Sequence, residues 1–107
     1  MSKLTSDTKR IQYQTNDSAS SSLTIDENLY NALCKKMANA DQWCKDVARE
    51  VRSELEKEAE VLRSRGELVK IVRGKAVPIT VDAYVRGKVS SGVRLRAMME
   101  VIDQKYL

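Results

Sequence analysis

Histidine and phenylalanine are both missing from this chain of 107 residues. Because histidine is the commonest general base and the commonest metal ligand, its absence argues against the usual catalytic and metal-binding sites. The two cysteines, Cys34 and Cys44, are too few for a zinc site and do not form a CxxC pair. Two isolated thiols are typical of reduced core residues in a cytoplasmic protein. We therefore expect a cytoplasmic protein without a metal or any other cofactor.

Long apolar runs are missing as well. No stretch approaches the roughly 18 residues that a membrane-spanning helix needs, and no N-terminal segment resembles a signal peptide. Nothing in the sequence sets a nucleophile beside a base, and a chain of this size has little room for a deep pocket. The sequence thus predicts a protein that is not an enzyme and does not associate with a membrane.

Large side chains are scarce, because only 5% of the residues are aromatic although 42% are apolar. A chain of this length corresponds to one domain, and a small domain without large side chains has a thin core. Burial of apolar surface against a second subunit is the simplest way to stabilise such a domain. We therefore expect an oligomer.

The N-terminal part of the chain contains one strand-like pattern. Residues 1–19 are polar and lack a consistent apolar period, so we expect a flexible basic arm. Beyond it the sequence alternates, with Leu23 and Ile25 facing one way. The small hydroxylated residues that face the other way are Ser20, Ser22 and Thr24. This pattern predicts a single short strand that is half buried.

Two helices are expected after this strand. Asp26 is a good N-cap, and the helix behind it places Leu29 and Leu33 on one stripe. The second helix, over residues 42–65, has the clearest pattern in the chain, with apolar residues at spacings of three and four. It ends at Gly66, a natural C-cap.

The short strand needs a pairing partner, because a strand of about five residues cannot form a sheet alone. The simplest solution is antiparallel pairing of residues 23–25 with the same segment of a second chain, about a two-fold axis. The expected fold is therefore mainly α with one short N-terminal strand, as a homodimer with an intersubunit antiparallel β-ribbon. The expected dimer core consists of Leu23, Ile25, Leu29, Leu33, Cys44, Val47, Val51 and Leu55.

The stretch SSSLTIDENLYNALCKKMANADQWCKDVAREV, residues 20–51, resembles the ribbon-helix-helix (Arc/MetJ-like) DNA-binding proteins in its order of strand, capped helix, tight turn and second helix. The resemblance implies a ribbon-helix-helix dimerisation and DNA-binding domain over residues 20–65, which inserts its β-ribbon into the major groove. It also implies base reading by the outward residues of the strand, and a phosphate held at the start of the second helix. The residues concerned are Ser20, Ser22 and Thr24 for the bases and Gln42 and Trp43 for the phosphate. Such small transcriptional repressors are common on plasmids and phages.

Residues 66–107 are expected to form a basic C-terminal extension that ends in a helix. They hold eight basic and four acidic residues, a net charge of +4 that equals the net charge of the whole chain. A near-repeat, VRGKAV at residues 72–77 and VRGKV at residues 85–89, predicts two turns. The terminal helix is expected after a break at residues 90–92. Basic residues outside the ribbon that we expect to contact phosphates are Lys9, Arg10, Arg73 and Lys75.

The sequence therefore favours a sequence-specific regulator whose partners are double-stranded DNA and a second copy of itself, with higher oligomers possible on DNA. An alternative remains open. In it the protein is a non-catalytic helical interaction protein, or resembles an antitoxin whose residues 66–107 bind a protein partner.

Overall fold

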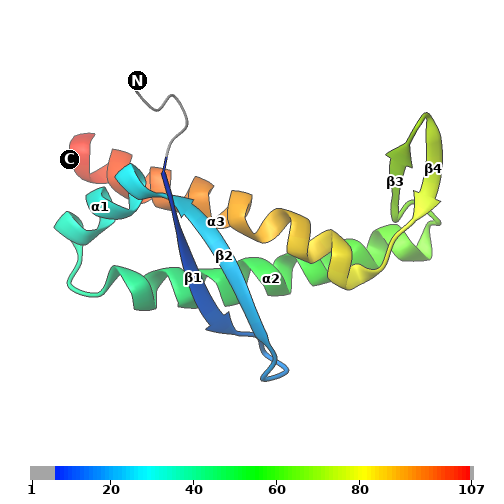
Figure 1. Ribbon diagram of the computed structural model, residues 1–107, viewed down its shortest axis with the longest axis horizontal. Coiled ribbons are helices and arrows are strands. Elements are labelled where there is room, and N and C mark those ends of the chain that lie inside the picture. The colour runs from blue at the N-terminus through cyan, green and yellow to red at the C-terminus, as the bar shows by residue number, and fades with distance from the viewer. Residues whose placement is uncertain (1–6, 107) are drawn as a thin grey trace.

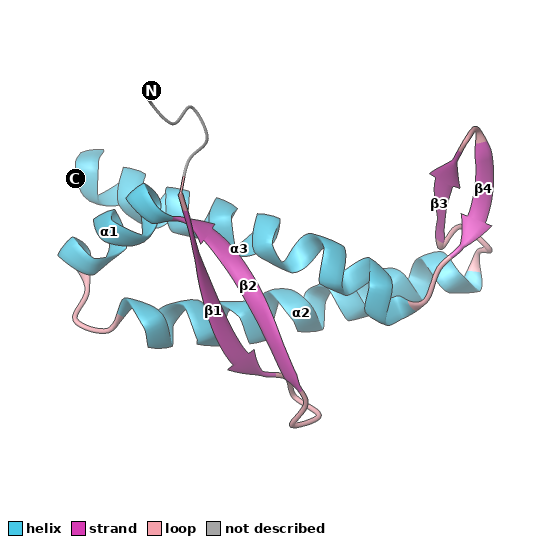
Figure 2. Ribbon diagram, viewed as in Figure 1, coloured by secondary structure: helices cyan, strands magenta, loops and turns pink. Residues whose placement is uncertain are grey.

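The computed structural model describes the backbone of residues 7–106, and the side chains of that range as far as residue 102. Its elements are two β-hairpins and three helices (Figures 1 and 2). In chain order they are β1 (Thr8–Gln14), β2 (Ser20–Asp26), α1 (Glu27–Lys36), α2 (Ala40–Ser64), β3 (Val69–Val72), β4 (Lys75–Pro78) and α3 (Val81–Tyr106).

The predicted fold of a single N-terminal strand in a ribbon-helix-helix dimer was wrong. Residues assigned to a flexible arm form β1, which pairs antiparallel with β2 in the same chain, from Thr8↔Asp26 to Gln14↔Ser20. A tight turn joins the two strands, in which the Thr15 amide donates to the carbonyl of Ala19 at 2.8 Å. Since β2 already has a partner along its whole length, it does not need a second chain.

The inner face of the β1–β2 hairpin forms part of one core with the helices. Ile11 and Tyr13 of β1 and Leu23 and Ile25 of β2 are all buried there. Figure 1 shows the hairpin crossing over α2 and α3, which supplies the helical cover that an isolated hairpin needs. One direct link is the backbone amide of Thr24, which donates to the Ser90 hydroxyl of α3 at 3.0 Å.

The residues expected in a dimer core all belong to this core within one chain. Six of them are buried and two pack against it while partly exposed. The buried ones are Leu23, Ile25, Leu33, Cys44, Val47 and Val51, and the partly exposed ones are Leu29 and Leu55. These residues therefore belong to the core of a single chain, in which the hairpin and α3 cover them.

Helix caps set the bends between β2, α1 and α2. Asp26 accepts hydrogen bonds from the amides of Asn28 and Leu29 at 2.8 and 3.3 Å, so it caps α1 as its sequence context predicted. Asn39 caps α2 in the same way, by accepting from the Gln42 amide at 3.0 Å.

Helix α3 begins much earlier than the sequence predicted. The second Arg-Gly-Lys segment and residues 90–92 lie inside it, and neither is a turn. Small residues are needed here because α2 and α3 pack closely along each other: a Cβ added at Gly92 would lie 2.6 Å from Val51 Cγ1. The glycine that looked like a helix breaker permits this close contact.

The first Arg-Gly-Lys segment does form a turn. It joins β3 to β4, with positive φ angles of 52° at Arg73 and 81° at Gly74. This second hairpin projects from the end of the helical pair where α2 ends and α3 begins (Figure 1). It lies far along the molecule from the middle of the β1–β2 hairpin.

Candidate functional site

The face of the β1–β2 hairpin that points away from the helices is polar, and we call it the hairpin outer face. It consists of three residues of β1 paired with three residues of β2. The pairs are Arg10↔Thr24, Gln12↔Ser22 and Gln14↔Ser20. Their positions follow from strand alternation, since the residues between them are those that face the core.

The six side chains of this face form hydrogen bonds, and none of the six is acidic. Glutamine amides both donate and accept, and the serine and threonine hydroxyls do the same with freer geometry. The next residue along the face is Asp26, but its carboxylate is turned to the first amides of α1. The six residues therefore present donors, acceptors and one positive charge.

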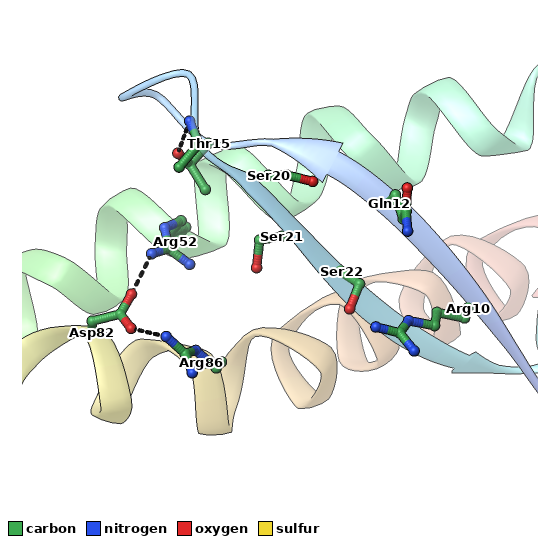
Figure 3. A pocket seen from close by; sticks show the side chains of 10 residues that line it. Arg10, Gln12, Thr15, Ser20, Ser21, Ser22, Arg52, Asp82 and Arg86 are labelled. Atoms are coloured by element: carbon green, nitrogen blue, oxygen red, sulfur yellow. Dashed lines mark hydrogen bonds and ion pairs between the residues drawn. The ribbon is translucent and has the colours of Figure 1, made fainter.

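A polar hollow of about 390 Å³ lies along the β2 edge of the hairpin, where the hairpin outer face meets α2 and α3, and we call it the arginine pocket (Figure 3). Its charged lining residues come from three elements: Arg10 of β1, Arg52 of α2, and Asp82 and Arg86 of α3. Serines of β2 provide hydroxyls beside them. In Figure 3 the guanidinium of Arg10 lies beside the Ser22 side chain.

Two of the three arginines pair with Asp82, and the buried one, Arg52, is held in place. Arg52 is only 9% exposed, and its Nη2 donates to Asp82 Oδ1 at 3.0 Å. Arg86 donates to the other oxygen of the same carboxylate. Although burial alone lowers the pKa of Arg52, hydrogen bonds with Tyr13 and Asp82 and the charge of Glu56 outweigh it and raise the pKa. Arg52 is therefore a fixed positive charge in the pocket.

Positive side chains also lie along the other edge of the hairpin. Lys45 and Arg49 of α2 line a second hollow, of about 320 Å³, together with Gln12 and Gln14 of β1. Arg49 Nε donates to the carbonyl oxygen of Gln14 at 3.0 Å, which ties this edge to α2. The hairpin outer face thus has basic residues on both sides.

The structure brings together some of the residues that the sequence predicted as a site. Ser20, Ser22 and Thr24 lie side by side on the hairpin outer face, with Arg10 on the neighbouring strand. Gln42 lines the hollow beside β1. Their contact with DNA stays a prediction.

Other predicted site residues lie elsewhere. The Lys9 ammonium lies over the Tyr30 ring, 4.9 Å from its centre, on the side of β1 that faces the helices. The Tyr30 hydroxyl donates to Asp41, and this hydrogen bond raises the pKa of Tyr30. Trp43 packs against the core. Arg73 and Lys75 lie at the tip of the β3–β4 hairpin, away from the hairpin outer face.

Sequence reasoning missed Gln12 and Gln14, and with them the arginine pocket. A signal was present, because RIQYQ at residues 10–14 alternates polar and apolar side chains as strands do. Arg52 and Arg86 could not be connected to the hairpin from sequence, because they lie 26 and 60 residues beyond Asp26, the last residue of β2, on two different helices. Their connection depends on how α2 and α3 pack.

Among residues 7–102, no cluster of acidic or cysteine side chains is able to hold a metal ion. Of the three helices described, none has the length and apolar character needed to cross a membrane. Comparison of the chain with protein-family models, with curated proteins and with solved structures gave no match. Any function must therefore be inferred from the geometry of the site itself.

Proposed function

We propose that the protein is a non-catalytic regulator that binds double-stranded DNA sequence-specifically, with the hairpin outer face in the major groove. The observation that supports this most is the composition of that face, a two-stranded antiparallel ribbon of polar side chains with no free carboxylate. A two-stranded ribbon fits the major groove of B-DNA. Both strands of the ribbon belong to one chain, so the contact of the ribbon with the bases would not require a second subunit to supply a strand. Such a regulator would act in the cytoplasm.

The spacing of the side chains matches that of base pairs. Alternate residues along a strand lie about 6.8 Å apart, which is about two base-pair steps of 3.4 Å. In this arrangement Gln12 and Gln14 each bind an adenine edge through their amide groups, which is a common pairing in the major groove. The hydroxyls of Ser20, Ser22 and Thr24 accept from or donate to the bases opposite them.

Charge on both edges of the hairpin supports the same docking. The phosphate backbones run along the two sides of the major groove. Lys45 and Arg49 lie beside β1, while Arg86 and Arg94 line hollows beside β2. Contacts from such residues would position the hairpin without selecting a sequence.

The first test is selection of bound duplexes from a random library by the wild-type chain and by Gln12→Ala. The wild type should enrich a short sequence. Gln12→Ala should weaken binding to that sequence roughly 5-fold to 150-fold, as expected for about 1–3 kcal/mol per bidentate base contact. It should also relax the preference at one base pair, while the salt dependence of binding stays the same.

Asn31→Ala is the matched control, because Asn31 is an exposed amide on α1, away from the hairpin outer face. It should behave as the wild type in the same selection. Retention of no duplex at low salt, or an identical enriched sequence with Gln12→Ala, would contradict the proposal.

A further inference from the structure

The arginine pocket has an excess of positive charge. Its lining holds three guanidinium groups, from Arg10, Arg52 and Arg86, and the single carboxylate of Asp82. Each oxygen of that carboxylate already accepts from an arginine, Oδ1 from Arg52 and Oδ2 from Arg86. The pocket is therefore suited to an anion.

One of these guanidinium groups, that of Arg52, is held in place before any ligand arrives. Arg52 is buried and bound by Asp82, and its Nε lies 3.6 Å from the Glu56 carboxylate, a residue outside the pocket lining. Arg86 is bound to Asp82 four residues before it on α3. Fixed guanidinium groups lose little side-chain entropy when they bind, and their planar donors match the oxygens of a phosphate.

A neighbouring hydroxyl adds a further donor to the pocket. Ser21 of β2, which has no part in the proposed base reading, lines the same hollow, and Figure 3 shows it on the hairpin side, opposite Arg86 and Asp82. Hydroxyls donate to phosphate oxygens that guanidinium groups leave free. A volume of about 390 Å³ with an open mouth admits a phosphate together with the groups esterified to it.

We propose that the arginine pocket binds a phosphate group, and that this group is a backbone phosphate of the duplex whose major groove receives the hairpin outer face. The assignment of the phosphate to DNA rests on the proposed function. Arg86 and Arg10 contact the phosphate from opposite sides, while the buried Arg52 contributes positive charge at the bottom of the pocket. The pocket adjoins β2, so the phosphate belongs to the strand of the duplex on that side of the groove.

The test compares Arg86→Gln with Arg63→Gln in the full chain. Both arginines are exposed helix residues paired with an acidic residue in the neighbouring turn, with side chains 71% and 65% exposed. Arg63 lies outside the pocket. Inorganic phosphate is titrated at constant ionic strength while the amide signals of Ser21 and Ser22 and the arginine Nε signals are followed by NMR. Saturable shifts are expected for the wild type and Arg63→Gln, and their loss is expected for Arg86→Gln and Arg10→Gln.

Duplex binding at several salt concentrations forms the second arm. Arg86→Gln should weaken binding to all duplexes equally, and should lower the slope of log K against log salt by about one. Its sequence preference should not change. Arg63→Gln should match the wild type in both respects.

The two arms separate the possible failures. Duplex binding without phosphate shifts, and with an unchanged slope for Arg86→Gln, would overturn the pocket assignment and leave the proposed function standing. Phosphate shifts without any duplex binding would overturn the DNA source, and would indicate a free phosphorylated ligand in the pocket. Phosphate shifts with an unchanged slope would likewise exclude the backbone phosphate as the ligand.

Discussion

The thiol of Cys44 is fully buried in the core, among apolar side chains of the helices and the hairpin. Burial disfavours the charged thiolate, and it raises the pKa of Cys44 from 9.0 to about 11. Because the folded state holds this proton more tightly than the unfolded state, the contribution of Cys44 to stability is complete below pH 9. It is lost as the pH rises from 9 to about 11.

Cys44→Ala tests this linkage. At neutral pH the variant should lose stability, on the order of 1 kcal/mol, because it leaves a small cavity. The difference in unfolding free energy between the wild type and Cys44→Ala should then shrink as the pH rises from 9 to about 11. Denaturant unfolding across this range measures it. A difference between the wild type and Cys44→Ala that stays constant across this pH range would refute the linkage.

At the scale of elements, the contact between α2 and α3 depends on a glycine. Gly92→Ala would place a Cβ 2.6 Å from Val51 Cγ1, and the branched valine cannot swing aside as a long side chain would. We expect a loss of about 1–3 kcal/mol in unfolding free energy, as for other overpacked cores. Adding Val51→Ala to Gly92→Ala should recover part of this loss, and thermal or denaturant unfolding of the double-mutant cycle measures it.

Gly87→Ala is the matched control on the same helix. A Cβ at Gly87 meets nothing within 4 Å, so the substitution should stabilise the protein by up to about 1 kcal/mol through helix propensity. If the two glycine variants changed stability alike, close packing of α2 against α3 would not be the reason for Gly92.

Local signals determined which elements were predictable from sequence. Asp26 caps α1 and the apolar stripe of α2 is buried as expected, since caps and helical periodicity depend on neighbouring residues. The start of α3 was not predictable in this way. Gly87 and Gly92 lower helix propensity, and the compensating contact with Val51 is visible only in the packed structure. For the same reason only part of the candidate site was predictable. The alternation of apolar and polar residues predicts the strand β2, whereas the pairing of β2 with β1 depends on the tertiary structure.

At the scale of the whole molecule, α3 leaves an apolar stripe uncovered. Leu95, Met99 and Ile102 are 60%, 57% and 46% exposed, and their spacing of four and three is that of a coiled-coil seam. We expect a second copy of the chain to cover it. In the proposed complex a single hairpin would span only a few base pairs, and DNA-binding regulators commonly pair two half-sites through a two-fold axis. Antiparallel contact of two α3 helices about Met99 places Leu95 of one chain against Ile102 of the other.

Met99→Glu should therefore shift the protein toward the monomer without unfolding it, because the residue is exposed in the single chain. Sedimentation equilibrium over a range of concentrations measures the change. Ile71→Glu is the control, since Ile71 is 69% exposed but lies on β3, away from the stripe. A wild type that stays monomeric at high concentration, or equal effects of the two substitutions, would refute this interface.

Pairing of β2 with β1 of the same chain has a consequence for the symmetry of recognition. A ribbon made of the same strand from two subunits is symmetric about its centre, and it favours a palindromic element under each ribbon. Here one strand presents Arg10, Gln12 and Gln14 and the other only small hydroxylated side chains. Such a ribbon has a direction. In the proposed complex with DNA, a single hairpin would therefore distinguish the two orientations of an asymmetric element, before any second copy binds.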